Sequence, residues 1–189
     1  MASEPNIEEA EQEQTLVSRA VDGDADAFGA LYTRHLDAIY RYIFFRVADV
    51  PLAEDLTEEV FVRAWTALPK YEPQGYRFAS WLYQIARNLV VDHYRVQSSR
   101  AHVDDPALED LPDPQQHPED QVADQEALAS LARAVQQLGD DEQHVIILRF
   151  VEGLSHRQVA ETIGKSEGAS RVIQHRALEA LAGLMETDE

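Results

Sequence analysis

Apolar residues recur at steps of three and four along the N-terminal half of the chain, which is the pattern of amphipathic helices. One stripe runs through residues 26–43, a second through 52–68 and a third through 78–96. Pro51 and Pro69 separate the stripes, because proline interrupts a helix interior. No segment sustains the alternation of a strand, so we predict an all-α bundle in this half of the chain.

The C-terminal part shows shorter stripes punctuated by glycine. We predict helices over residues 126–138, 140–151 and 155–163, and a last helix that begins after Ser166. Only Gly164 and Lys165 would separate the last two helices. Helix, tight turn, helix is the arrangement of a helix-turn-helix, although plain helical hairpins also have such turns.

In a helix-turn-helix that binds DNA, the start of the second helix faces base edges in the major groove. The residues that we expect to read bases there are Ser166, Glu167, Ser170, Arg171 and Gln174. Lys165 and Arg176 would suit phosphates, because both carry a positive charge beside that surface. On spacing alone the alternative is a hairpin with a solvated polar face.

An acidic, proline-rich segment separates the two helical regions. Residues 101–125 hold four prolines and eight acidic residues, with no Lys or Arg. Such a segment cannot bury a core, and its charges repel one another. We predict a disordered acidic tail over 1–15, a domain over 16–100, a flexible linker over 101–125 and a second domain over 126–186.

The composition excludes several classes of protein. The chain has 189 residues and no cysteine, so it has no disulfide framework and no thiol nucleophile. Its start is acidic and its apolar runs are short, so we expect no signal peptide, no membrane insertion and a cytoplasmic location. The histidines show no paired metal spacing and no catalytic motif is complete, so we expect no metal, no cofactor and no enzymatic activity.

The distribution of charge bears on whether the chain binds nucleic acid. The chain carries 16 basic and 35 acidic residues, a net charge of −19, whereas a free DNA-binding protein normally has a basic face. The region 16–100 is nearly neutral, because its ten basic residues almost balance its acids. There, arginines interleave with aromatic residues between positions 70 and 100, as in sites that hold unstacked bases, or as in an ordinary core beneath an arginine-bearing face.

Three stretches together resemble the extracytoplasmic-function (ECF) group of bacterial RNA polymerase sigma factors. They are AEDLTEEVFVRAWTAL at 53–68, FASWLYQIARNLVVDHYR at 78–95 and EGLSHRQVAETIGKSEGASRVIQHRALEAL at 152–181. The resemblance implies two helical domains: a sigma domain two bundle over 16–100 and a sigma domain four helix-turn-helix over 126–186. It implies a factor that binds polymerase core, recognises the minus-thirty-five and minus-ten elements of promoters and promotes DNA opening.

The resemblance also assigns roles to residues. Binding to the clamp helices of the largest polymerase subunit falls on Asp55, Glu58, Glu59, Val62 and Arg63, and the flap region of polymerase is a further implied contact to which no residues are assigned. The minus-ten element, where a base is flipped into a protein pocket, falls on Tyr76, Arg77, Gln84, Arg87, Asn88 and Arg95. The minus-thirty-five element falls on the helix-turn-helix residues named above. Polymerase, promoter DNA and an anti-sigma factor are the implied partners, and the factor would join the nucleoid as part of the holoenzyme.

The chain departs from the family pattern in the turn before the second C-terminal helix. Gly139, Asp140 and Asp141 stand where a Leu-Pro-Pro-like turn is usual in the family. Two other functions were weighed: a standalone helix-turn-helix regulator, and a polymerase-binding adaptor or antagonist. The motifs of the first domain and the net charge disfavour the regulator, and the arginine-rich face disfavours the adaptor.

Overall fold

The computed structural model of the chain describes residues 7–72, 77–101 and 119–186, and every regular element within these ranges is helical. The N-terminal domain consists of α1 (Ile7–Val21), α2 (Ala25–Val47), α3 (Val50–Ala67), the 3-10 turn η1 (Leu68–Lys70) and α4 (Phe78–Ala101). The C-terminal domain consists of α5 (Glu119–Gln136), α6 (Asp140–Ile146), the π-turn η2 (Ile147–Val151), α7 (His156–Ile163) and α8 (Glu167–Glu186). The predicted all-α fold with two domains is confirmed.

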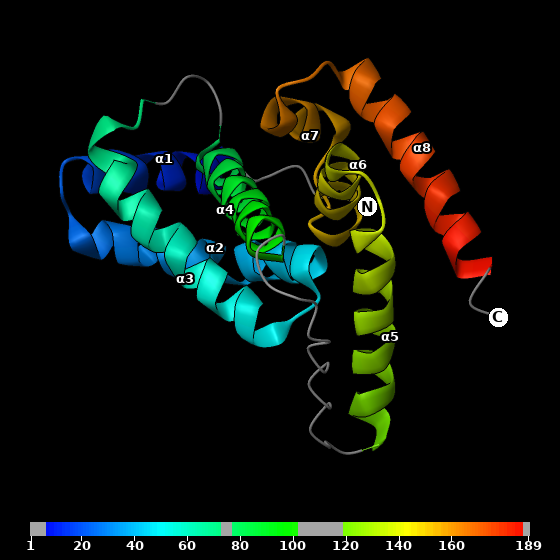
Figure 1. The fold of residues 1–189 in the computed structure, drawn as a ribbon. Helices are drawn as coiled ribbons and strands as arrows, with labels where there is room; N and C mark the ends of the chain where they lie inside the picture. The colour runs from blue at the N-terminus through cyan, green and yellow to red at the C-terminus, as the bar shows by residue number, and fades with distance from the viewer. Residues whose placement is uncertain (1–6, 73–76, 102–118, 187–189) are drawn as a thin grey trace.

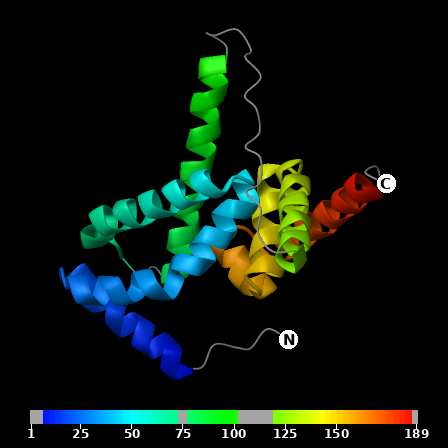
Figure 2. The same ribbon diagram turned by 90° about the horizontal axis from the view of Figure 1, so that it is seen from below.

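The two domains lie side by side and touch along α2 and α4 (Figure 1). Helix α2 is the central element, because it packs against α1, α3 and α4 of its own domain and also against α5 and η2. Helix α4 contacts α7, while its C-terminal end extends away from both domains (Figure 2). Helix α4 therefore contacts the C-terminal domain along part of its length and is exposed to solvent at its end.

Side-chain caps fix where the central helices begin. The Asp24 carboxylate accepts a hydrogen bond of 3.0 Å from the backbone N–H of Ala27 at the start of α2. Asp49 does the same for Leu52 at 2.7 Å, and Pro51 stands in the first turn of α3, where its missing N–H costs nothing. Ala48, between α2 and α3, adopts a left-handed φ of 49°, which turns the chain sharply. The predicted break at Pro51 is thus the boundary of two adjacent helices.

The structure corrects the predicted disordered tail over residues 1–15. Residues 7–15 belong to α1, which packs on α2 through the buried side chains of Val17 and Ala20. Glu8 and Glu9 lie in its first turn, where negative charge is favourable to the helix dipole. Acidic composition alone suggested disorder, but the apolar residues at the end of the same helix provide a surface to bury.

The C-terminal domain also begins earlier than predicted. Helix α5 starts at Glu119 rather than at residue 126, which shortens the predicted linker at its C-terminal end. The last proline of the segment is Pro118, so nothing after it interrupts a helix. Residues 102–118 of the predicted linker lie outside the described residues.

A π-turn replaces the predicted single helix over residues 140–151. Helix α6 ends at Ile146, and the N–H of Glu152 donates to the carbonyl of Ile147 at 3.0 Å, a step of five residues. Leu148 stays fully buried, whereas Phe150 is 56% exposed. Periodicity predicted the helix correctly but could not show the extra residue within its last turn.

Leu82 provides a test of the N-terminal core. Its side chain is fully buried in α4, so Leu82→Ala should lower the free energy of unfolding by about 3 kcal/mol. Val91 on the same helix is 42% exposed, and Val91→Ala should change stability by less than about 0.5 kcal/mol. Urea denaturation followed by circular dichroism measures both, and equal losses would contradict this placement of the core.

Candidate functional site

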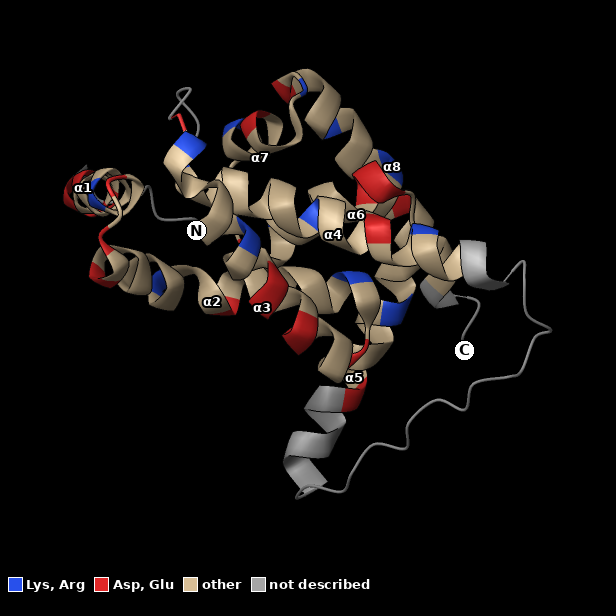
Figure 3. Ribbon diagram, turned by 60° about the vertical axis from the view of Figure 1, so that its left-hand side comes forward, with Lys and Arg blue, Asp and Glu red and all other residues tan. Residues whose placement is uncertain are grey.

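The outer face of α3 carries all five residues predicted to bind polymerase core. Asp55, Glu58 and Val62 are exposed, while Leu56 and Val60 on the opposite side are buried. The ion pair of Arg63 with Glu59, at 2.7 Å, spans one helical turn of that face. The face is therefore acidic at its start and more apolar toward its end, as the distribution of charges on α3 in Figure 3 also indicates.

Trp65 was not among the predicted site residues, although it extends the same outer face. Its ring is 40% exposed and packs on Phe28 of α2, with ring centroids 4.9 Å apart. Val62, one turn earlier, is 60% exposed, so the two side chains form an apolar strip beside the acidic residues. The signal in the sequence was the spacing of positions 58, 62 and 65, which place their side chains on one side of a helix.

The predicted minus-ten residues divide into three groups. Tyr76 lies outside the described residues, in the segment 73–76. Gln84 and Arg87 contact the C-terminal domain. The remaining residues stay open to solvent: Arg77, Asn88 and Arg95.

An aromatic cluster lies where the segment before α4 enters the helix. Tyr71, Phe78 and Trp81 pack against one another, with centroids 4.6 Å apart for Tyr71 and Trp81 and 5.5 Å for Phe78 and Trp81. His35 of α2 reaches the ring of Phe78 at 5.7 Å. Trp81 is half-buried in this cluster, so it supports the start of α4 as a core residue, which was the alternative to a base-stacking role.

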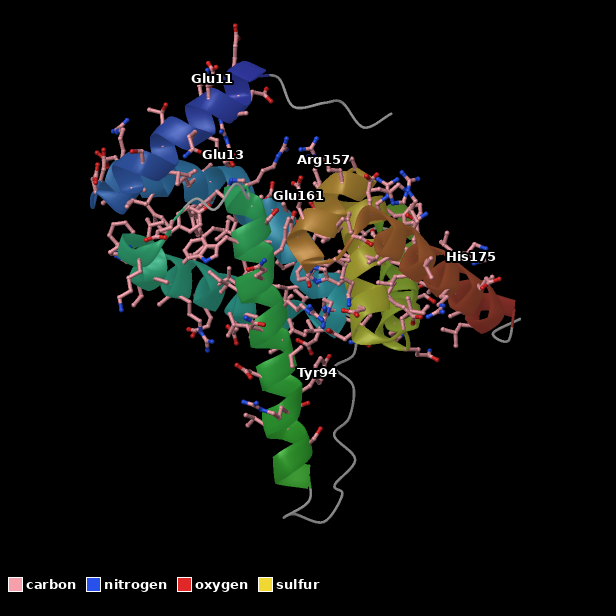
Figure 4. The ribbon with its side chains drawn as sticks, turned by 90° about the horizontal axis from the view of Figure 1, so that it is seen from above. Glu11, Glu13, Tyr94, Arg157, Glu161 and His175 are labelled. Carbon is pink, nitrogen blue, oxygen red and sulfur yellow. The ribbon has the colours of Figure 1, made fainter. Side chains whose placement is uncertain are left out.

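Glu13 ties α1 to this cluster. Its carboxylate lies 3.3 Å from Nε2 of His35 and 3.6 Å from the guanidinium of Arg34, on the side of α1 that faces α2 (Figure 4). Burial alone would raise the pKa of Glu13, but the hydrogen bond and charge of His35 and the charges of Arg34 and Arg77 outweigh it and lower that pKa. Arg77, a predicted DNA contact, thus interacts electrostatically with a carboxylate of α1.

The helix-turn-helix forms as predicted. The Ser155 hydroxyl accepts from the N–H of Gln158 at 3.2 Å, and the Gln158 side chain accepts from the N–H of Ser155 at 2.7 Å. Gly164 ends α7 with a left-handed φ of 65°, and the Ser166 hydroxyl caps α8 by accepting from Ala169 at 3.1 Å. The capping box and the two-residue turn were both readable from the sequence.

Five of the residues predicted to contact the minus-thirty-five element lie on the exposed side of this unit. Lys165, Ser166, Glu167, Arg171 and Arg176 are all solvent-accessible. Glu167 and Arg171 form an ion pair of 3.0 Å on the first turn of α8. Gln174 is half-buried, because its carbonyl accepts from Arg149 at 3.3 Å.

Ser170 does not fit the prediction that it reads bases. Its side chain is fully buried, between exposed neighbours at 168 and 171, because α8 turns this position toward α7. The predicted helix is correct, but its predicted exposed face included one buried position, Ser170.

The two domains meet through charged and polar side chains. Arg46 of α2 is 4% exposed and donates to the carboxylate of Asp140 on α6 and to the hydroxyl of Tyr42, the latter at 3.2 Å. Arg87 of α4 donates to the second oxygen of Asp140 and, at 3.0 Å, to Asp141. Burial alone would raise the pKa of Asp140, but hydrogen bonds and charge from these two arginines hold it below its usual value.

A second group of contacts flanks this pair. Arg41 binds the carboxylate of Glu152 with both nitrogens, at 2.9 and 3.1 Å, and that carboxylate is only 4% exposed. Ser80 donates to Thr162 of α7 at 2.8 Å, because the Thr162 hydroxyl gives its own proton to the α7 backbone. At another point of the interface between the domains, Gln136 of α5 donates to the hydroxyl of Tyr94 on α4 at 3.3 Å; Tyr94 is labelled in Figure 4.

His144 is a fully buried titratable group of this interface, as is its partner Tyr42. The Tyr42 hydroxyl accepts from Arg46 and lies 2.5 Å from Nδ1 of His144, so it donates its proton to that nitrogen. Burial and the charges of Arg46 and Arg87 lower the pKa of His144 to about 3, so the ring is neutral at pH 7.

The described ranges contain no cluster of three or more metal-binding side chains. Within the same ranges, no helix is long and apolar enough to cross a membrane.

Comparison with known proteins identifies both domains. Residues 31–100 match Sigma-70 region 2, and residues 134–182 match Sigma-70 region 4. The chain is 42% identical to the ECF RNA polymerase sigma factor BldN of Streptomyces coelicolor over 173 residues, which cover 92% of this chain and 66% of BldN. It is 35% identical to the RNA polymerase sigma factor CarQ of Myxococcus xanthus, covering 89% of this chain and 95% of CarQ.

A solved structure shows the same arrangement of helices. CnrH, in complex with the cytosolic domain of CnrY, superposes with a TM-score of 0.72 at 25% identity, over 94% of this chain and 99% of that chain. The agreement extends across both domains because nearly the whole of each chain is covered.

The buried imidazole predicts a pH dependence. The unfolded chain binds a proton at His144 below about pH 6.5, whereas the folded chain does not until about pH 3. Stability should therefore fall as pH decreases, and this residue should contribute a loss of about 2 kcal/mol between pH 7 and pH 5.

His144→Gln removes the titrating group and keeps an acceptor for Tyr42. Urea denaturation of both proteins at the two pH values measures the difference between their slopes. The buried carboxyl of Glu152 has a raised pKa and contributes with the opposite sign, but equally in both proteins. Identical pH dependences would contradict a neutral buried His144.

Proposed function

The chain belongs to the ECF group of bacterial RNA polymerase sigma factors, and from this we propose how its two domains share the binding of polymerase core and promoter DNA. Sigma factors of this group bind core, recognise promoters and initiate transcription. One observation supports this assignment of the two binding functions to the two domains. The faces assigned to polymerase and to the minus-thirty-five element lie on the solvent sides of α3 and α8, whose other sides form the two cores.

The outer face of α3 is the proposed contact with polymerase core. Exposed acids at Asp55 and Glu58 lie beside the apolar strip of Val62 and Trp65. An apolar centre flanked by charge is typical of protein interfaces, and the charges steer association and set orientation. Helix pairs of basic character on the polymerase are the partner that this combination suits.

The exposed face of α4, together with the segment before it, is the proposed contact with the opened minus-ten element. Arg77, Arg87 and Arg95 supply positive charge along one side of the helix. The aromatic cluster beneath the first turn holds that side in place. Tyr76 is proposed as a stacking partner for an unpaired base on its sequence position alone.

The start of α8 is the proposed contact with the minus-thirty-five element. Arg171 is 60% exposed in its side chain, and Lys165 and Arg176 are exposed beside it. Arginine and lysine at these positions fit major-groove guanines and the adjacent phosphates.

The net charge of −19 favours a factor that binds promoters as part of a larger assembly. The acids of this chain repel duplex phosphates, and polymerase would supply the missing attraction. This requirement disfavours a standalone regulator. Sigma factors are generally not enzymes, and we propose that this chain has no catalytic activity of its own and acts in the cytoplasm, on the nucleoid, where polymerase works.

An anti-sigma factor is the proposed regulator. The related CnrH was solved bound to the cytosolic domain of CnrY, and it shares this fold across both domains. We propose that a protein of this kind binds the present chain and withholds it from polymerase.

Run-off transcription tests the proposed function. Core polymerase with this chain, on a pool of promoter fragments, should give transcripts that core alone does not give. Reversing the charge of the α3 face with Asp55→Arg and Glu58→Arg should weaken binding to polymerase core about tenfold, because it removes the charge complementarity of the contact. Both side chains are exposed, so the hydrophobic interior of the domain should stay intact.

A matched pair controls for net charge. Asp22 and Glu126 are exposed and lie outside α3, so the double variant Asp22→Arg, Glu126→Arg should bind core as the parent chain does. Fluorescence titration of labelled core measures both affinities. If the two double variants bind equally well, α3 is not the core-binding face.

Neighbouring positions on α8 test the promoter contact. Arg171→Ala should weaken binding of the holoenzyme to its promoter duplex about tenfold, as expected for loss of a base or phosphate contact. Ser170→Ala should leave affinity unchanged, because that side chain is buried. Fluorescence anisotropy with a promoter from the transcription pool measures both, and the reverse order would show that α8 presents a different side to DNA.

A further inference from the structure

The C-terminal domain covers part of the surface proposed to bind the minus-ten element. Ser80 is buried against Thr162, and the side-chain amide of Gln84 donates to the Thr162 carbonyl at 3.4 Å. Arg87 donates to Asp140 and Asp141. In this arrangement Ser80 is buried and Arg87 is 30% exposed, with its guanidinium bound to carboxylates, so full access of a DNA strand to this part of α4 requires the domains to separate.

Two of the carboxylates at the contact between the domains, Asp140 and Asp141, belong to one short segment, residues 139–141, which we call the acidic turn. One oxygen of Asp140 accepts from Arg46 and the other from Arg87. Asp141 accepts from Arg87 at 3.0 Å and from Lys165 at 3.1 Å. The acidic turn thus binds cations that would otherwise face DNA in both domains: Arg87 on α4 and Lys165 before α8.

Carboxylates can occupy such positions because they resemble phosphate in the contacts they make. Both groups present anionic oxygens that accept two hydrogen bonds from one guanidinium. An apolar turn in that place would leave Arg46 and Arg87 without these carboxylates.

We propose that the acidic turn is an autoinhibitory element that occupies the DNA-binding cations of both domains and keeps the free chain closed. The proposal rests on the proposed function, because the role of these cations in DNA binding is part of that function. It goes beyond it in assigning inhibition to the chain itself, without a partner protein.

The physical character of the contact makes it reversible. Arg46 is buried in the closed chain, and opening exposes both it and Asp140 to water. Hydration of the separated charges offsets much of the attraction that is lost, so an intact buried pair adds little net stability. Removing only the carboxylate has a different effect, because Arg46 would remain buried without a counter-charge. Neutralising the acidic turn should therefore open the chain.

Distance measurement between spin labels tests this directly. The chain contains no cysteine, so Ala30→Cys on α2 and Ala182→Cys on α8 allow two specific labels at exposed positions. In the full-length chain, pulsed electron paramagnetic resonance should give one narrow distance distribution. Adding Asp140→Asn and Asp141→Asn should shift the distribution to longer, broader distances.

A binding measurement tests whether opening of the chain increases its affinity for single-stranded DNA. A fluorescein-labelled single strand of about twenty thymidines should bind the Asp140→Asn, Asp141→Asn chain roughly fivefold more tightly than the parent chain, because a larger fraction is open. Asp22→Asn with Glu126→Gln removes the same charge at exposed positions outside the contact, and should change neither the distance nor this affinity by a comparable factor.

The distance result decides the proposal independently of the proposed function. If the labels stay at the short distance in the Asp140→Asn, Asp141→Asn chain, the acidic turn does not hold the domains together and the proposal is overturned. If that variant loses helical circular dichroism, Arg46→Gln with Arg87→Gln breaks both ion pairs of Asp140 from the other domain, and an unchanged distance there overturns the proposal as well. An open chain that gains no DNA affinity would retain the closing role but overturn the competition with DNA.

Discussion

A guanidinium buried between two domains cannot remain without a counter-charge, and the closed arrangement of this chain depends on that constraint at Arg46. Its side chain is 4% exposed and bonds Asp140 of the other domain and Tyr42 of its own helix. Tyr42 in turn bonds the neutral His144, so one charge orders a chain of buried polar groups across the boundary. The contacts of α2 with α5 and η2 surround this chain of hydrogen bonds.

The local pattern of the sequence predicted most of the fold. Caps and breakers defined the helices correctly, as at Ser155, Gly164 and Ser166. It failed where long-range packing decides: residues 7–15 of α1 were predicted to be disordered because they are acidic, whereas they continue a helix whose Val17 is buried against another helix. The contact of Arg87 with the acidic turn was equally invisible, since 53 residues separate the partners along the chain.

The candidate site was predictable in its positions and less so in its orientation. All five residues assigned to the α3 face share one side of that helix, because helical periodicity alone determines which positions lie together. Trp65 was missed because an aromatic residue is equally consistent with a core. Ser170 was misassigned because the rotation of α8 depends on how it packs against α7, which periodicity near the helix start does not settle.

The π-turn at Ile147–Val151 acts as a one-residue insertion in the helix that leads into the helix-turn-helix. In a regular α-helix each residue adds about 100° of rotation and about 1.5 Å of rise. Losing one residue here would rotate everything that follows by about that angle relative to α6. Insertions and deletions at this point therefore offer an evolutionary route to re-orienting α8 relative to the rest of the chain without altering a single side chain of α8.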